Sequence, residues 1–243
     1  MRFQTRLREF LVRRGIEVRR NRFPRPLDVV ADRVSASAPV LFDVGAHVGQ
    51  TALELRRRFP AGTVHAFEPS PDSFARLQAA TAGDARCELH PFALAEARGS
   101  RTLHVNASSA TSSLKELTEG ASEEWRDERL TTVERVEVEV RTLDEFCAER
   151  SIESIDFLKI DVQGGEYAVL EGASGMLGRR AVRFVQSEFI LVGTYEGQRP
   201  LHEYLSLMDR RGYRLVDFFS PLRRDGQLLQ CDLLFTPREA PGA

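Results

Sequence analysis

The chain has 243 residues, of which 42% are hydrophobic and 29% are charged, and its formal net charge is −2. This length fits one α/β domain with additions, and the nearly balanced charge gives no general attraction to nucleic acid. No apolar run is long enough to span a membrane, no signal-peptide core is present, and three separated cysteines fit no metal-ligand spacing. We therefore expect a cytoplasmic protein with reduced cysteines.

The first residues predict a basic amphipathic helix. Phe3, Leu7, Phe10 and Leu11 recur at helical spacing among arginines, and Gly15 ends the pattern. Such a helix packs on the domain, covers the active site, or meets a membrane or an acidic partner. We assign residues 1–38 to an N-terminal basic helical extension and residues 39–243 to the main domain.

From Pro39 the pattern alternates between strand and helix, which predicts an α/β fold with a mostly parallel sheet. Ser70 is expected to be the N-cap of the second helix of this region, and residues 106–131 break the regular pattern. Two strands joined through Asp225-Gly226 end the chain as an antiparallel hairpin, as Rossmann-like methyltransferases do and dehydrogenases do not. The expected strands are 39–44, 63–67, 86–90, 101–105, 133–140, 155–160, 182–187, 213–219 and 228–235, and the main helices are 49–59 and 200–212.

A glycine turn follows the first strand and predicts a cofactor site. Asp43-x-Gly45-x-x-x-Gly49 lacks the Gly-x-Gly-x-x-Gly spacing that brings a pyrophosphate to the backbone. Its N–H groups instead suit the methionine end of S-adenosylmethionine. Glu68 ends the second strand, where an acid can bind both ribose hydroxyls. A purely structural turn would explain the glycines but not Glu68.

Four blocks in order resemble the FkbM family of S-adenosylmethionine-dependent methyltransferases. They are Asp43-Val-Gly-Ala-His-Val-Gly, Ala66-Phe-Glu-Pro-Ser, Phe92-Ala-Leu and Leu158-Lys-Ile-Asp-Val-Gln-Gly-Gly-Glu. The resemblance implies a Rossmann-like class I fold, with a mostly parallel seven-stranded sheet and an antiparallel last strand. It also implies O-methylation of a hydroxyl on a sugar, glycan or polyketide-type natural product.

Cofactor contacts carry over from the resemblance by position. Many relatives have Asn at the position of His47 and Glu at the position of Gln163, so both positions depart from the family pattern. The implied cofactor-binding residues are Asp43, Gly45, Ala46 and Gly49 at the methionine portion, Glu68 at the ribose, the backbone around Phe92 and Ala93 at the adenine, and, with no portion assigned, His47, Pro69 and Asp161.

Methyl transfer to a hydroxyl needs alignment and a proton acceptor. Asp161 ends a strand at the carboxyl edge of the sheet and is the expected catalytic base, although it could also cap the following helix. Glu188 ends the next strand and could share this role. The two carboxylates together could hold Mg²⁺, but Gln163 lacks the acid that such a site would use, so Mg²⁺ is not favoured.

The acceptor is expected to be a small molecule or glycan that contacts Gln163, Tyr195 and His202. Tyr195 could stack on a sugar or lie in a surface turn, and residues 107–113 could bind hydroxyls or form a flexible loop. His47, His104 and His202 are alternative bases, whereas His65 and His90 are expected to be packed. N-methylation, a nucleotide-dependent oxidoreductase, a non-catalytic binding module and a homo-oligomer remain alternatives.

Overall fold

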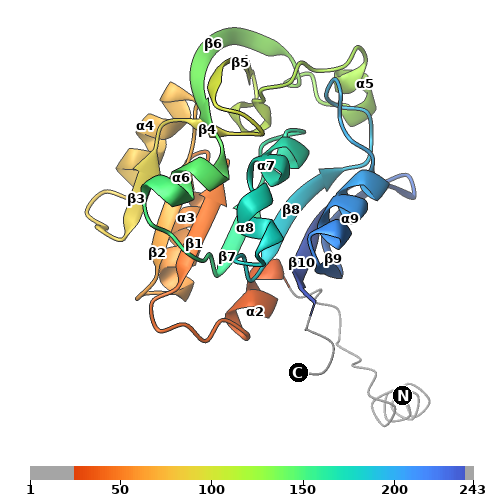
Figure 1. Cartoon of the computed structure of the whole chain (residues 1–243). Helices are drawn as coiled ribbons and strands as arrows, with labels where there is room; N and C mark the ends of the chain where they lie inside the picture. The colour runs from red at the N-terminus through yellow and green to blue at the C-terminus, as the bar shows by residue number, and fades with distance from the viewer. Residues whose placement is uncertain (1–24, 239–243) are drawn as a thin grey trace, which may run out of the picture.

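A seven-stranded sheet forms the centre of the computed structural model, which describes residues 25–238 (Figure 1). The strand order is β3-β2-β1-β7-β8-β10-β9; the first five strands run parallel, and β10 is antiparallel to both of its neighbours. This confirms the predicted sheet with an antiparallel last strand. The strands are β1 (Val40–Val44), β2 (Thr63–Phe67), β3 (Cys87–His90), β7 (Phe157–Ile160), β8 (Val185–Ile190), β9 (Tyr213–Arg224) and β10 (Gln227–Pro237).

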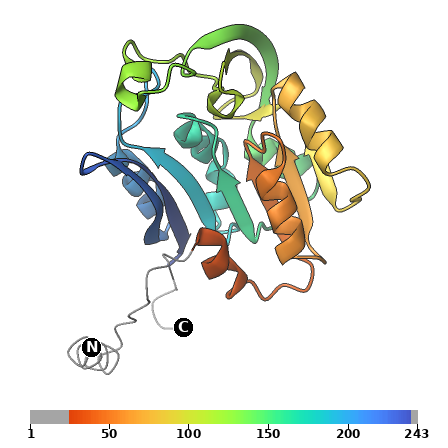
Figure 2. The ribbon, with the colours of Figure 1, turned by 180° about the vertical axis from the view of Figure 1, so that it is seen from behind.

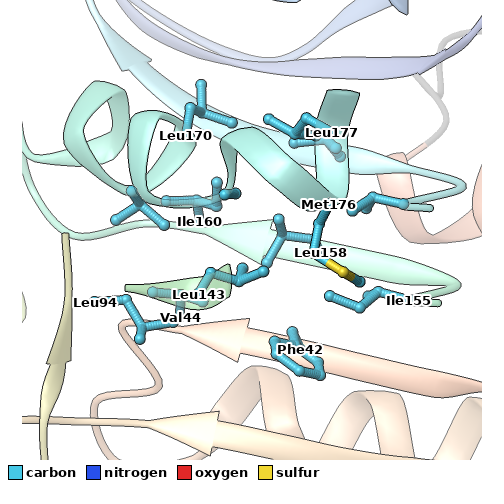
Figure 3. Packing of buried hydrophobic residues seen from close by; sticks show 14 of the residues in the cluster. Phe42, Val44, Leu94, Leu143, Ile155, Leu158, Ile160, Leu170, Met176 and Leu177 are labelled. Atoms are coloured by element: carbon cyan, nitrogen blue, oxygen red, sulfur yellow. The ribbon is translucent and has the colours of Figure 1, made fainter. Parts of the chain in front are cut away.

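Helices cover both faces of this sheet (Figures 1 and 2). Side chains alternate along each strand, so Phe42 and Val44 face one helical layer and Leu41 faces the other. Figure 3 shows Phe42, Leu158 and Ile160 pointing toward the first layer. That layer holds α6 (Leu143–Glu149), α7 (Glu166–Gly172), α8 (Ser174–Gly178) and α9 (Leu201–Arg210), and the opposite one holds α2 (Pro26–Ala31), α3 (Gln50–Arg58) and α4 (Pro71–Ala80).

A second sheet lies across the carboxyl ends of the parallel strands (Figure 2). It has the order β4-β6-β5 and was not predicted as a separate sheet, although both of its longer strands were expected. The irregular region between those strands contains two short helices. The elements are β4 (Ala93–Leu94), β5 (Gly99–Asn106), the 3₁₀ turn η1 (Ser109–Thr111), α5 (Ala121–Trp125) and β6 (Thr132–Arg141).

The strand that contains Glu188 differs from its prediction. It was expected over 182–187, but β8 begins at Val185 and continues to Ile190, so Glu188 lies inside the strand. Pairing with β10, in which Glu188 is opposite Asp232, carries the strand past the predicted end. The terminal hairpin is as predicted, and Asp225 and Gly226 have positive φ values of 50° and 84° at its turn.

The remaining predictions concern the ends of elements and the first residues. Ser70 is the N-cap of α4, although its side chain caps no helix N–H. The helix expected before Gly15 lies outside the described residues. In the described part of the assigned extension, Leu27 and Val30 of α2 are buried among core residues of the main domain.

Two histidines occupy the core, as predicted. His65 and His90 are buried on neighbouring strands, and their rings are hydrogen bonded to each other at 3.2 Å beside Phe146. Their burial among aromatic rings is the environment expected of packed core residues. Every helix within residues 25–238 is too short or too polar to cross a bilayer.

Candidate active site

A cavity of about 360 Å³ lies at the carboxyl ends of β1, β2 and β7. The glycine turn after β1 and Glu68 after β2 form one side, and Ala93 and Leu94 of β4 form another. Residues 107–115, which we call the roof, close the cavity through Ser109, Ser112 and Lys115. An open α/β sheet places its ligand crevice at this edge.

The two glycines of the turn have different functions. Gly45 has φ +81° and lines the cavity, and a Cβ atom there would lie 1.8 Å from the carbonyl oxygen of Asp161. The turn can therefore pack directly against the end of β7. Gly49 has φ +91° but packs on Leu77 of α4 and does not line the cavity. Gly49 was predicted to contact the cofactor, but the structure places it between the glycine turn and α4, where it allows close helix packing.

Asp43 is also outside the cavity wall. It is fully buried on β1 opposite Lys159 of β7, and Lys159 Nζ lies 3.1 Å from Asp43 Oδ1. The same ammonium lies 3.5 Å from Asp161 Oδ2 and donates to the carbonyl of Gly45 at 3.1 Å. Burial opposes the charge of Lys159, but the two carboxylates outweigh it and raise the pKa of the ammonium.

Glu68 faces the cavity with both carboxylate oxygens held by the backbone. Oε2 accepts a hydrogen bond from the N–H of His47 at 2.8 Å, and Oε1 accepts one from the N–H of Ser70 at 2.9 Å. Burial raises the pKa of Glu68, and these two donors act in the opposite direction. Ala46, His47 and Pro69 line the wall beside it.

The strand after β3 presents Ala93 but not Phe92 to the cavity. Ala93 lines the wall, whereas the ring of Phe92 is buried and packs against Phe67 and the guanidinium of Arg141. The predicted contact of this pair therefore falls on Ala93. The prediction concerned the backbone around both residues, and the side chain of Phe92 points into the core.

Asp161 lines the cavity and forms part of a polar network behind it. Gln163 Nε2 donates to Asp161 Oδ1 at 2.9 Å and to Glu188 Oε2 at 2.8 Å. Glu188 is buried and also accepts from Gln230. Burial, and then the nearby charge of Asp161, raise the pKa of Glu188. The structure thus brings both predicted acids together but places Glu188 behind Gln163, away from the cavity.

Two predicted acceptor contacts do not reach the cavity. Tyr195 is only 2% exposed, because its ring packs over Gly164 and its hydroxyl lies between Thr111 and Gln163. Tyr195 is therefore too buried to stack on a sugar, and it does not lie in a surface turn. His202 is exposed on α9 and is not a lining residue. His104 is buried on β5 and does not line the cavity either.

The roof is anchored to the turns below it. His47 Nε2 and Ser109 Oγ are 2.8 Å apart, and Ser113 Oγ donates to the carbonyl of Gln163 at 2.6 Å. His47, at the position that departs from the family pattern, therefore connects the glycine turn to the roof.

Sequence reasoning missed several residues of the site. Lys159 had a signal, because a lysine inside the apolar strand Phe157–Ile160 requires a buried partner. Glu166 had none, since it follows the turn as an ordinary helix residue. Hydroxyl binding was one of the two interpretations of residues 107–113, and Ser109, Ser112 and Ser113 of that segment line the cavity. Arg101, Leu103 and Lys115 were missed, because their place at the cavity depends on the second sheet.

Comparison with known proteins assigns this arrangement to a family. A family model described as the methyltransferase FkbM domain matches residues 43–215. The chain is 31% identical over 176 residues to the 2-O-methyltransferase NoeI of Sinorhizobium fredii, covering 70% of this chain and 71% of that protein. It is also 31% identical over 202 residues to the 31-O-demethyl-FK506 methyltransferase FkbM of Streptomyces tacrolimicus, covering 75% of each. The chain belongs to the FkbM methyltransferase family.

The protein is therefore an S-adenosylmethionine-dependent methyltransferase with a class I α/β fold. Membership of this family argues against the two alternatives of an oxidoreductase and a non-catalytic module. Among solved structures, an rRNA methylase from Streptococcus thermophilus shares the fold, with a TM-score of 0.50, 13% identity and coverage of 90% of this chain and 99% of that one.

Glu166 of this FkbM-family protein is buried behind the turn that carries Gln163. Its Oε1 accepts from the N–H groups of Val162 at 2.9 Å and Gly164 at 3.2 Å. Burial raises the pKa of Glu166 from 4.5 to about 7. The folded protein therefore keeps a proton that the unfolded chain releases near pH 4.5, and stability falls as the pH rises toward 7.

We predict that Glu166→Gln removes this pH dependence, because the amide oxygen can still accept both hydrogen bonds without titrating. The free energy of unfolding of the variant, relative to wild type, should rise by about 3 kcal/mol between pH 4.5 and 8. Urea denaturation at stepped pH measures it. Glu171→Gln, at an exposed position of the same helix, is the control. A Glu166→Gln difference that stays constant with pH would contradict the prediction.

Proposed function

We propose that this methyltransferase acts on a hydroxyl group of a carbohydrate, or of a glycosylated or polyketide-type natural product. The observation that carries the proposal is the Asp161 carboxylate at the cavity wall, whose side chain is 37% exposed and is held by Gln163 and Lys159. Two similar proteins, NoeI and FkbM, support it, since the name of each describes O-methyl transfer.

The other described carboxylates are less suited to accept a proton from a substrate. Asp43 and Glu188 are buried and lie outside the cavity wall. Glu68 lines the cavity but already binds two backbone N–H groups, and Glu96 pairs with Arg101. Among these carboxylates, Asp161 is therefore the proposed base.

A hydroxyl must lose its proton as the new O–C bond forms, and a positioned carboxylate contributes roughly 10²–10⁴-fold to such a step. S-adenosylmethionine supplies an electrophilic methyl group on a sulfonium, which leaves as a neutral thioether. Asp161 accepts the proton of the acceptor hydroxyl. Lys159 stays cationic beside Asp161 and is a fixed counter-charge rather than a second base.

The residues on the other side of the cavity fit the cofactor. The backbone N–H groups of His47 and Ser70 fix both oxygens of Glu68, and each oxygen retains a lone pair for a ribose hydroxyl. The turn at Gly45 and Ala46 offers bare backbone to the methionine portion, and Ala93 offers an apolar wall to the adenine. Pro69 and His47 complete this half.

The acceptor would enter from the other half, beneath the roof. Ser109 and Ser112 bring hydroxyl groups to the cavity, and Arg101 and Lys115 bring positive charge. These groups take the place of Tyr195 and His202 as proposed acceptor contacts. A wall of hydroxyl groups suits a polyhydroxylated ligand, because both partners donate and accept hydrogen bonds.

Mg²⁺ is not part of the proposal. The Gln163 amide nitrogen lies between Asp161 and Glu188, 2.9 and 2.8 Å from one oxygen of each. A cation held by both carboxylates would have to displace this donor. An amide nitrogen is also no ligand for Mg²⁺, which binds oxygen.

We predict that Glu68→Ala weakens binding of S-adenosylmethionine about 10- to 100-fold, because hydrogen bonds to a charged acceptor are lost at the ribose. Isothermal titration calorimetry measures the dissociation constant. Glu88→Ala removes a carboxylate from β3, away from the cavity, and should bind as wild type does. An unchanged dissociation constant for Glu68→Ala would refute the ribose contact.

The function itself is tested by release of S-adenosylhomocysteine over a panel of methyl glycosides, hydroxylated macrolides and matched amino sugars, each with and without EDTA. We expect turnover with a hydroxyl acceptor and no loss in EDTA. Methylation of the amino sugars at nitrogen alone would overturn the assignment to oxygen. Loss of turnover in EDTA would show that the reaction requires a metal ion.

We predict that Asp161→Asn lowers kcat about 10²–10⁴-fold on the best acceptor of that panel, because the amide cannot take the proton. Its affinity for S-adenosylmethionine, measured by calorimetry, should stay within a factor of about three of the wild-type value. Turnover equal to that of wild type would exclude Asp161 as the base.

A further inference from the structure

Tyr195 has a buried hydroxyl that the proposed chemistry does not use directly. The hydroxyl lies 3.0 Å from Gln163 Oε1 and 2.9 Å from the carbonyl oxygen of Thr111 in the roof. The ring covers Gly164, where an added Cβ atom would lie 2.7 Å from it. Gln163 and Gly164 both have positive φ, so the ring packs on a tight turn that ends β7.

The hydrogen bonds of Gln163 leave its amide one acceptable orientation. Its two N–H hydrogens are both used, one by Asp161 and one by Glu188. Its oxygen then needs a donor, and the Tyr195 hydroxyl is beside it. A reversed amide would point its oxygen at two carboxylates, which is electrostatically unfavourable.

The roof contacts this turn directly through Ser113 and indirectly through Tyr195. The Thr111 carbonyl and Gln163 Oε1 share the single proton of the Tyr195 hydroxyl, and Ser113 Oγ donates to the backbone carbonyl of Gln163. Beyond the roof, Leu117 forms a bridge with Tyr195, and Trp125 Nε1 donates to Thr194 Oγ1 at 2.7 Å. The position of the roof and the orientation of the amide therefore share one hydroxyl group.

We propose that Tyr195 is a positioning residue for methyl transfer, which orients the Gln163 amide that holds Asp161 at the cavity and links this orientation to the seated roof. The proposal rests on the proposed role of Asp161 as the base. Tyr195 contacts neither the cavity nor its ligands, so it acts through Gln163.

The first test needs no acceptor. In the complex with S-adenosylhomocysteine, the Gln163 side-chain NH₂ is identified in ¹H–¹⁵N spectra by its loss in Gln163→Met. We expect Tyr195→Phe to raise its hydrogen-exchange rate about tenfold, because one hydrogen bond that orders the amide is gone. An unchanged exchange rate would overturn the proposal.

Tyr213→Phe is the matched control. The Tyr213 hydroxyl is equally buried and donates to the carbonyl of Val182 at 2.7 Å, remote from the cavity. Both variants lose one buried hydroxyl, but only Tyr195→Phe should alter the Gln163 amide. An equal effect of both variants would show a loss of general stability and not positioning.

The second test uses the best acceptor of the panel and a double-mutant cycle. Tyr195→Phe should lower kcat about tenfold with little change in the affinity for S-adenosylmethionine, whereas Tyr213→Phe should be unchanged. In Gln163→Met, adding Tyr195→Phe should cause no further loss, since both act through one amide. Fully additive losses would overturn the proposal.

The pH profile separates positioning from packing. Gln163→Met removes both hydrogen bonds that the amide donates to the Asp161 and Glu188 carboxylates, so the acidic limb of kcat/KM should move to higher pH. Tyr195→Phe should move it in the same direction by less. Glu166 of α7, Asp232 of β10 and Lys159 of β7 also act on Glu188 and are unchanged in both variants. An acidic limb that does not move in Gln163→Met would contradict the link.

These tests fail separately from the proposed function. If wild type methylates nothing in the panel, the acceptor class is wrong, but amide exchange still decides the role of Tyr195. If wild type methylates a hydroxyl and Tyr195→Phe does so equally well, the function stands and the positioning role is lost.

Discussion

The structure of the site depends on one buried ammonium group. Lys159 lies between Asp43, which is fully buried, and Asp161, which lines the cavity, and it also binds the carbonyl of Gly45. A buried charge is stable only with partners of good geometry, so these three positions are fixed relative to one another. Asp161, the glycine turn and the first strand are therefore connected at one point beneath the cavity.

The same interaction explains the sequence at the ends of β1 and β7. Asp43 and Lys159 are register partners on adjacent parallel strands, so their side chains lie on one face of the sheet. Gly45 follows because a side chain there would collide with the Asp161 carbonyl. The residues expected to contact a cofactor thus include Asp43, which lies behind the cavity wall and supports residues that line it.

Local patterns predicted the main sheet and half of the site. Strand and helix periodicity located the parallel strands, and Glu68 and Asp161 were found because they end strands at the carboxyl edge. Side-chain direction was harder to predict. Phe92 points into the core and Tyr195 packs on Gly164, and both orientations depend on neighbours distant in the sequence. The second sheet depends on pairing between β5 and β6 across the irregular region, which no local pattern specifies.

The position of Trp125 has a practical consequence. It is the single tryptophan of the chain, and its indole N–H binds Thr194 while its backbone carbonyl accepts from Arg224 of the terminal hairpin. Indole fluorescence responds to the polarity and hydrogen bonding around the ring. The protein thus carries an intrinsic optical reporter, free of background from other tryptophans. It lies on the segment that joins the roof to β9 at the edge of the main sheet.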